Sequence, residues 1–220
     1  MENKFINLII LCLAFLFSGC VNTTPKADYS AFLQNNPKSL LVVMPTNETV
    51  EVKASNAVLT SAVLPLAEAG YYVFPVSVVN ETFKNNGISE ASEIQAISTQ
   101  KLKEIFGADA VLYLNVSEYG SSYKIITSDT TVSINAKLVD LNNGEVLWQK
   151  TATASQGSSG GGNILIMLIS AVIEQIASNI SDRGYDVASM ANLILFSQNC
   201  NDCLLYGELS PNFRKDKQLQ

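Results

Sequence analysis

The chain has 220 residues, 47% of them hydrophobic, so it can bury a core of ordinary size. Its net charge is −6 and its 14 lysine and arginine residues form no basic stripe, which argues against a nucleic-acid partner and against strong attraction to anionic headgroups. The sequence contains no histidine and only four cysteines, so we expect no metal site and no cofactor.

An apolar run at the N-terminus ends at Cys20. Residues 5–17 form an uncharged stretch of 13, shorter than the about 20 residues that span a bilayer but typical of a secretion signal. The small residues Ser18 and Gly19 precede the cysteine, and this segment resembles the lipobox of bacterial lipoproteins. The resemblance implies that residues 1–19 are removed and that lipid is attached to the thiol of Cys20.

The residue after the cysteine bears on the location. Val21 stands where an Asp would resemble an inner-membrane retention signal, so we expect a protein that is lipid-anchored in the outer membrane and faces the periplasm. Several acyl chains on one cysteine would hold it firmly, since a single chain binds only marginally. An ordinary secretory signal with a chance cysteine and an uncleaved anchor helix remain the alternatives.

The first half of the mature chain alternates strands and helices. Residues 20–38 are polar and contain two prolines, so they are predicted to be a lipidated N-terminus and tether. The continuous apolar run 39–45 predicts a buried strand. Residues 56–69 have the apolar spacing of a helix, in which Pro65 should cause a kink or end the regular part, before Gly70 ends the helix.

Further strands and a helix follow. Residues 71–79 are predicted to be a strand, in which Pro75 indicates an edge or a bulge. Residues 93–106 have the spacing of a half-buried helix that ends at Gly107, and residues 110–116 are continuous enough to form a central strand.

A hairpin completes the predicted sheet. Residues 131–139 alternate apolar and polar side chains, residues 140–144 form a turn, and residues 145–154 return as a strand. The prediction is a single α/β domain over residues 39–207, of an α+β sandwich-like type. It has a mixed sheet of about five strands in the order β-α-β-α-β-β-β, followed by C-terminal helices.

Several segments resemble one known family. They are Gly70–Val76 (GYYVFPV), residues 82–87 (TFKNNG), residues 107–112 and Trp148. These segments resemble a DUF799-like family of bacterial outer-membrane lipoproteins of unknown function. That family is similar in fold to the N-terminal domain of TolB and to the periplasmic part of the curli secretion lipoprotein. The resemblance implies an accessory of an envelope assembly with partner lipoproteins, and it implies no reaction.

Two short motifs partly match those of phosphate-binding loops and of acyl enzymes. The glycine-rich loop 155–162 lacks the Lys-Ser/Thr of a phosphate-binding loop, so a flexible linker is the better interpretation. Ser98 and Lys101 fit the S-x-x-K pattern of penicillin-recognising acyl enzymes, but the other motifs of that class are incomplete and too closely spaced. We therefore expect no catalytic residues and no enzyme.

Residues 163–180 form the most apolar stretch of the mature chain. A helix that is apolar all round is buried or spans a membrane, and the ten apolar residues here reach only about 15 Å, half of a bilayer core. The helix could lie wholly in the monomer core, enter lipid, or pack one side on the sheet and the other on a second subunit. We favour the last, which implies a homo-oligomer, a dimer or larger. The predicted interface residues are Leu165, Leu168, Ile169, Val172 and Ile176.

The C-terminal part contains a cysteine pair. Residues 187–197 are predicted to be a last helix, followed by Cys200 and Cys203 and by a polar tail over residues 208–220. In an oxidising compartment the two cysteines are expected to form a disulfide. A catalytic C-x-x-C normally begins a helix, whose dipole lowers the thiol pKa. This pair follows a helix end, which favours a structural disulfide over a redox site.

Together these features favour a non-enzymatic scaffold or accessory subunit of a trans-envelope export or assembly machine. Its partners would be other envelope lipoproteins and, through the lipid anchor, the membrane. The alternative is a regulatory docking module for a cell-wall synthase, as the similarity in fold to lipoproteins with that role implies.

Overall fold

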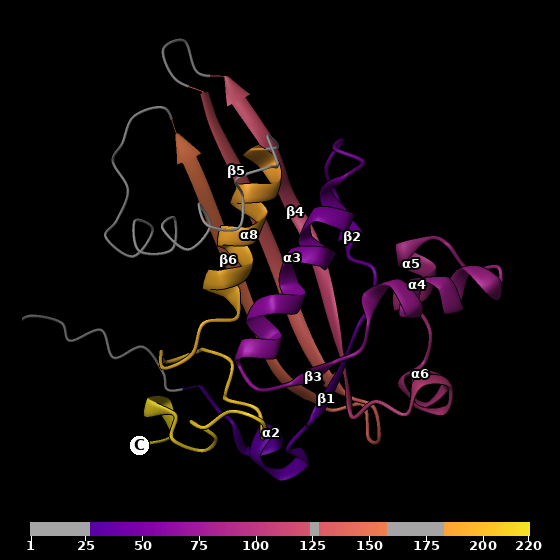
Figure 1. Ribbon diagram of the computed structural model, residues 1–220, viewed down its shortest axis with the longest axis vertical. Coiled ribbons are helices and arrows are strands. Elements are labelled where there is room, and N and C mark those ends of the chain that lie inside the picture. The colour runs from indigo at the N-terminus through magenta and orange to yellow at the C-terminus, as the bar shows by residue number, and fades with distance from the viewer. Residues whose placement is uncertain (1–26, 124–127, 158–182) are drawn as a thin grey trace, which may run out of the picture.

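The computed structural model describes residues 27–123, 128–157 and 183–220 (Figure 1). Its centre is a six-stranded mixed sheet with the order β3-β1-β4-β5-β6, in which β2 also pairs with β4. β1 pairs in parallel with β3 and with β4, and β2 pairs in parallel with β4. The pairs β4–β5 and β5–β6 are antiparallel. The strands are β1 Ser39–Val42, β2 Thr46–Asn47, β3 Tyr72–Val73, β4 Ala110–Tyr123, β5 Ser128–Asp140 and β6 Val146–Gly157. This confirms the predicted α/β class and its mixed sheet.

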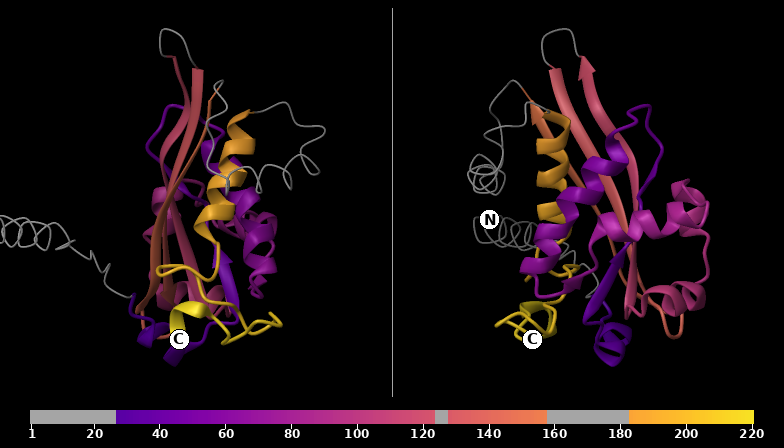
Figure 2. Two further views of the ribbon diagram at one scale, coloured as in Figure 1. Left: turned by 90° about the vertical axis from the view of Figure 1, so that its left-hand side faces the viewer. Right: turned by 45° about the vertical axis from the view of Figure 1, so that its right-hand side comes forward.

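Helices cover both faces of the sheet (Figure 2). α3 and α8 pack on one face, and α4, α5 and α6 pack on the other. The helices are α2 Ser30–Asn35, α3 Ala54–Glu68, α4 Val76–Asn85, α5 Ala91–Gln95, α6 Thr99–Phe106 and α8 Arg183–Leu195, with a short 3-10 helix η1 at Lys217–Leu219. None of the helices in the described ranges is long and apolar enough to cross a membrane.

The two faces carry separate cores because side chains alternate along each strand. In β4, Leu112 and Leu114 belong to the larger core under α3 and α8, whereas Val111 belongs to the smaller core under α4–α6. β5 follows the same rule, with Leu138 in the larger core and Val139 in the smaller one. The predicted hairpin of β5 and β6 is confirmed, including its turn, where Gly144 has a φ of 76°.

The predicted strand 71–79 is wrong beyond Val73. Pro75 is the residue immediately before α4, where the helix does not need the backbone N–H that proline lacks. Val79 and Phe83 of this helix are both buried, and their spacing of four residues places them on one face of a helix. The signal for β structure in this segment came from its valines.

Two predicted helices differ in detail. The helix predicted over residues 93–106 is two helices, because Ser98 caps the start of α6 by accepting a hydrogen bond from the backbone N–H of Lys101 at 3.3 Å. Gly107 ends α6 with a φ of 70°, as predicted. α3 continues through Pro65 to Glu68, so the proline does not end it.

The predicted tether and tail both contain folded segments. Within the predicted tether, α2 buries Phe32, and Tyr29 beside it is buried too. Within the predicted polar tail, Ser210, Asp216 and Gln218 are buried. Each segment has too few apolar residues to show a period, and each gains its order from packing on the other end of the chain.

Candidate functional site

Most of the predicted site residues lie outside the described residues. These are the lipidation site Cys20 and the predicted interface residues Leu165, Leu168, Ile169, Val172 and Ile176. The glycine-rich loop beyond residue 157 lies outside them as well. All of these stay predictions. Among the described residues, polar and reactive side chains gather in two other regions: the turn that contains Cys200 and Cys203, and one half of a sheet face.

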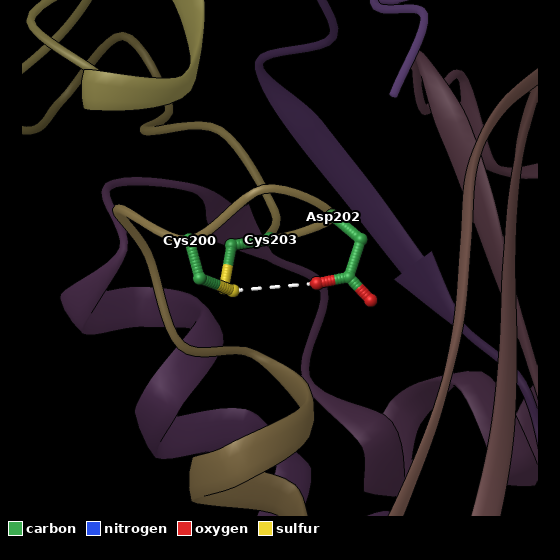
Figure 3. Close-up of side chains that lie close together, drawn as sticks. All are labelled: Cys200, Asp202 and Cys203. Atoms are coloured by element: carbon green, nitrogen blue, oxygen red, sulfur yellow. Dashed lines mark hydrogen bonds between the residues drawn. A yellow bond between two sulfur atoms is a disulfide. The ribbon is translucent and has the colours of Figure 1, made fainter. Parts of the chain in front are cut away.

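The predicted disulfide between Cys200 and Cys203 is present, with Cα atoms 5.0 Å apart. It closes a turn after α8, which we call the cysteine turn (residues 200–203; Figure 3). Its two sulfurs differ in environment, because Cys200 is exposed and Cys203 is fully buried. The carboxylate of Asp202 points back toward the disulfide, and its Oδ1 lies 3.4 Å from the Sγ of Cys200 (Figure 3).

Lys150 of β6 brings a positive charge to the cysteine turn. Its Nζ lies 3.3 Å from the Sγ of Cys200, 3.4 Å from the Sγ of Cys203 and 3.1 Å from Oδ1 of Asp202. Only 10% of the Lys150 side chain is exposed. The Oγ of Ser197 lies 3.2 Å from the Sγ of Cys203. The sulfur of Cys203 therefore has two polar neighbours, one of which is a poorly solvated ammonium.

The backbone of the cysteine turn is fixed from three sides. Trp148 donates from Nε1 to the carbonyl of Asp202 at 2.9 Å. The carbonyl of Cys203 accepts from the hydroxyl of Tyr29 at 2.5 Å and from Nε2 of Gln218 at 3.3 Å. Burial raises the pKa of Tyr29 to about 12, so this hydroxyl stays protonated as a donor. The turn thereby joins the N-terminal and C-terminal segments to β6.

The cysteine turn also contains a group of three possible metal ligands. The ligand atoms of Cys200, Asp202 and Cys203 lie within 4.8 Å of one another. Metals bind cysteine as the thiolate, and here the two sulfurs are bonded to each other. The oxidised turn therefore offers a single carboxylate, which does not fit a stable metal site.

The second region is the part of the sheet that α4–α6 do not cover. The smaller core includes β1, β4 and β5 side chains, and within the described residues it includes none from β6. Beside it lies a hollow of about 770 Å³, lined by strand residues and by Gln95 and Thr99 of the helices. We call the strand residues that face it, on the side away from α3 and α8, the open face: Tyr113, Asn115, Asn135, Lys137, Gln149 and Thr151.

Hydrogen bonds fix the polar groups of the open face in place. Asn135 donates from Nδ2 to Oδ1 of Asn115 at 3.2 Å, and Thr151 donates from Oγ1 to Oδ1 of Asn135 at 2.7 Å. These three residues lie side by side across β4, β5 and β6. In the next row, Nζ of Lys137 lies 5.7 Å from the ring centroid of Tyr113, and burial raises the pKa of that tyrosine.

Only part of these two regions could be predicted from the sequence. The alternation over residues 131–139 indicated a strand with one wet face, which is the central strand of the open face. Lys150 begins one of the incomplete motifs of the acyl-enzyme class (residues 150–152), and nothing in the sequence linked it to the cysteines. Ser98 and Lys101 have structural roles instead, since Ser98 caps α6 and Lys101 forms an ion pair with Glu104 at 3.3 Å.

Comparisons with known proteins show similarity to lipoproteins over most of the chain. The chain is 46% identical over 199 residues to "Putative lipoprotein NMB1124/NMB1162" of Neisseria meningitidis serogroup B (strain ATCC BAA-335 / MC58), covering 90% of this chain and 93% of the relative. The crystal structure of lipoprotein GNA1162 from Neisseria meningitidis is 51% identical, with a TM-score of 0.55, and the match covers 65% of this chain and all of that one.

A more distant structure is a PelC dodecamer from Paraburkholderia phytofirmans, 15% identical with a TM-score of 0.47, covering 79% of this chain and 93% of that one. A likeness at that level carries no argument about assembly. The predicted relations to DUF799-like proteins, TolB and the curli lipoprotein stay predictions. The profile of the family described as "Putative lipoprotein GNA1162-like" matches residues 27–209, which include the whole described sheet, and the chain therefore belongs to this lipoprotein family.

Proposed function

We propose that this protein is a non-enzymatic accessory subunit, or scaffold, of a trans-envelope export or assembly machine. It is anchored through lipid on Cys20 in the outer membrane, faces the periplasm and binds other envelope lipoproteins. The membership in a lipoprotein family supports the anchor. The open face supports the binding role and is the observation on which the proposal rests.

The open face has the properties of a surface prepared for a polar partner. Its amides and hydroxyls are already oriented by hydrogen bonds to one another, so little side-chain freedom is lost when a partner binds. Gln149 and Lys137 are exposed beside this row and carry groups that can pair with a partner. Tyr113 adds an aromatic ring with a polar end, a type of residue enriched at interfaces.

Self-association is the second part of the proposal. The apolar segment 163–180 would pair with the same segment of another copy, using Leu165, Leu168, Ile169, Val172 and Ile176. Large exposed apolar patches are rare on monomers, and a twofold axis would remove one with a single self-complementary surface. A homo-oligomer, dimer or larger, would present several open faces to the machine.

A docking module for a cell-wall synthase is the alternative. The open face belongs to a single copy of the chain, so it could bind a synthase without any self-association. The two functions therefore differ in oligomeric state and in the identity of the captured partner.

Site-specific photo-crosslinking in the native envelope tests the proposal. A crosslinking residue at Gln149, which is exposed on the open face, should capture a small and reproducible set of envelope proteins. The matched control is Glu81, which is exposed on α4 on the helical side of the same face. The same products from both positions would contradict the proposed binding surface. Capture of a cell-wall synthase from Gln149 alone would favour the alternative.

A further inference from the structure

The two sulfurs of the cysteine turn are unequal in a way that suits thiol exchange. Cys200 is exposed and can be reached by another thiol, whereas Cys203 is fully buried. From this asymmetry and from the groups around each sulfur, we infer that the Cys200–Cys203 disulfide is a reversible thiol-exchange site whose reductant is a protein dithiol.

The exchange begins at the exposed sulfur. One thiolate of the incoming dithiol attacks the Sγ of Cys200, the bond between Cys200 and Cys203 breaks, and Cys203 leaves with the electron pair as a thiolate. The second thiol of the dithiol then attacks the dithiol sulfur that is bonded to Cys200, and its proton passes to Cys200, which leaves as a neutral thiol. The dithiol becomes a disulfide, and its two electrons reduce the protein to a thiol at Cys200 and a thiolate at Cys203.

The environment of Cys203 stabilises it as the leaving group. A sulfur that departs as a thiolate leaves faster when its negative charge is stabilised. Nζ of Lys150 lies 3.4 Å from this sulfur, and Oγ of Ser197 lies 3.2 Å from it, so an ammonium and a hydroxyl can both donate to the thiolate. The ammonium lies as close to the Sγ of Cys200, at 3.3 Å, so it is the hydroxyl that favours Cys203 over Cys200. Because only 10% of the lysine side chain is exposed, water screens this attraction weakly.

Asp202 favours a negative charge on Cys203 over one on Cys200. Its Oδ1 lies 3.4 Å from the Sγ of Cys200 (Figure 3), so a negative charge on that sulfur would be repelled. Breaking the disulfide with the charge on Cys203 avoids this repulsion. Asp202 also forms an ion pair with Lys150 at 3.1 Å, which does not involve sulfur and holds the ammonium beside the two cysteines.

The rest of the fold can keep its shape when the disulfide opens. Trp148, Tyr29 and Gln218 bind backbone carbonyls of the turn, and these bonds do not involve sulfur. The reduced turn is therefore held near its oxidised position, which is required for reversible exchange. A purely structural disulfide, which only holds the C-terminal segment in place, would resist reduction until the segment unfolds.

The experiment uses the full lipidated chain in detergent, equilibrated with mixtures of reduced and oxidised glutathione. Mass spectrometry after alkylation measures the reduced fraction of Cys200 and Cys203, and near-UV circular dichroism reports whether the fold is kept. We expect reduction of the folded protein, and a roughly tenfold smaller equilibrium constant for reduction in Lys150→Met, since thiolate stabilisation by a neighbouring cation is lost. Ser197→Ala should shift it in the same direction by less.

Lys137→Met is the matched control, because this lysine lies on the open face and touches neither sulfur. Single cysteine variants locate the attack: Cys203→Ala should form a glutathione adduct on Cys200, whereas Cys200→Ala should leave Cys203 free. The inference is overturned if the folded protein stays oxidised in millimolar reduced glutathione, or if Lys150→Met and Ser197→Ala both behave like the control. It is also overturned if the adduct forms on Cys203.

Discussion

Two tyrosine hydroxyls hold the segment that follows the disulfide. Tyr29 donates to the carbonyl of Cys203 and Tyr71 donates to the carbonyl of Leu205, both at 2.5 Å. Burial raises the pKa of Tyr29 to about 12 and raises that of Tyr71 well above its usual value. Unfolded tyrosine titrates near pH 10. The hydroxyl of Tyr29 therefore stabilises the fold fully below about pH 10, and this contribution is lost as the pH rises through about 12. The contribution of Tyr71 has the same sign.

The corresponding prediction concerns alkaline stability. Tyr29→Phe should lower the free energy of unfolding by about 1 kcal/mol at pH 8, since one hydrogen bond is lost. It should also reduce the further loss of stability between pH 10 and 11, because one of the tyrosines with a raised pKa is gone. Urea unfolding at pH 8, 10 and 11 measures both effects. Tyr72→Phe is the control, because this ring is half-exposed, and equal pH profiles for the two variants would contradict the assignment.

Gly70 is the residue at which the C-terminal segment approaches the backbone most closely. Its φ is 96°, and a Cβ here would collide with the backbone nitrogen of Ser210. The backbone N–H of Leu209 donates to the carbonyl of Gly70 at 3.1 Å. A side chain at this position would have to displace the whole contact.

A matched pair of glycine substitutions tests this contact. Gly87 also has a positive φ, 78°, but a Cβ there would meet no atom within 4 Å. Gly87→Ala should therefore cost only the backbone strain, about 1 kcal/mol. Gly70→Ala adds the collision, and its loss of unfolding free energy should exceed that of Gly87→Ala by about 1–3 kcal/mol. Thermal denaturation of both variants measures the difference, and equal losses would show that residues 207–210 do not pack as described.

The N-terminus of α6 is capped by one side chain, that of Ser98. Ser98 accepts from the backbone N–H of Lys101, which is the N-cap interaction that serine provides. Ser98→Ala should lower the free energy of unfolding by about 1 kcal/mol, and Ser98→Asp should restore most of it, because aspartate is an equally good cap. Chemical denaturation of the three proteins checks this. A loss that aspartate fails to restore would mean that the hydroxyl has another role.

The elements that could be predicted are those whose signals are local. Continuous apolar runs predicted β1 and β4, and the alternation of apolar and polar side chains predicted β5. The turn 140–144 predicted the hairpin of β5 with β6. The two-residue strand β2 could not be predicted, because its order comes from pairing with β4, far away in the chain. β3 was predicted, as the first part of a segment that was expected to continue as a strand to residue 79. α4 was missed because three of its first four residues are valines, although Pro75 marks its start.

In the candidate site, too, local features could be predicted and contacts between distant residues could not. The spacing of Cys200 and Cys203 predicted their disulfide from the sequence alone. The contact of Lys150 with the two sulfurs joins residues about fifty positions apart, and it depends on the register of β6 and on where α8 ends. The alternation that puts Lys137 and Asn135 on one side of β5 was visible, but the bonds among three strands were not.

At the scale of the whole molecule, the two ends of the described fold are joined. α2 and the cysteine turn are linked through Tyr29, and Lys38 forms an ion pair with Glu208 at 2.7 Å. With lipid on Cys20, seven further peptide units would reach Ala27, which is at most about 25 Å of extended chain. The proposed anchor would therefore place α2 and the cysteine turn near the membrane surface.

Oligomeric state is the property of the whole molecule that decides between the two proposed functions. The scaffold function requires self-association through residues 163–180, whereas docking onto a synthase does not. A form of the chain that starts at Val21 should be a dimer or larger at tens of micromolar. Single Asp substitutions at five positions show whether this segment lies in the core or at a subunit interface. The positions are Leu165, Leu168, Ile169, Val172 and Ile176.

Some of these substitutions should unfold the protein and others should give a folded monomer, because burying an unpaired carboxylate at an interface is costly. Val50→Asp is the control: this valine is 95% exposed on the loop after β2, so its variant should keep both the fold and the parent's molar mass. Light scattering measures the mass and circular dichroism the fold. If the parent is monomeric, or if every folded variant keeps the parent's mass, the segment is only part of the core. The docking function would then be favoured, because the open face of a single copy would be the remaining binding surface.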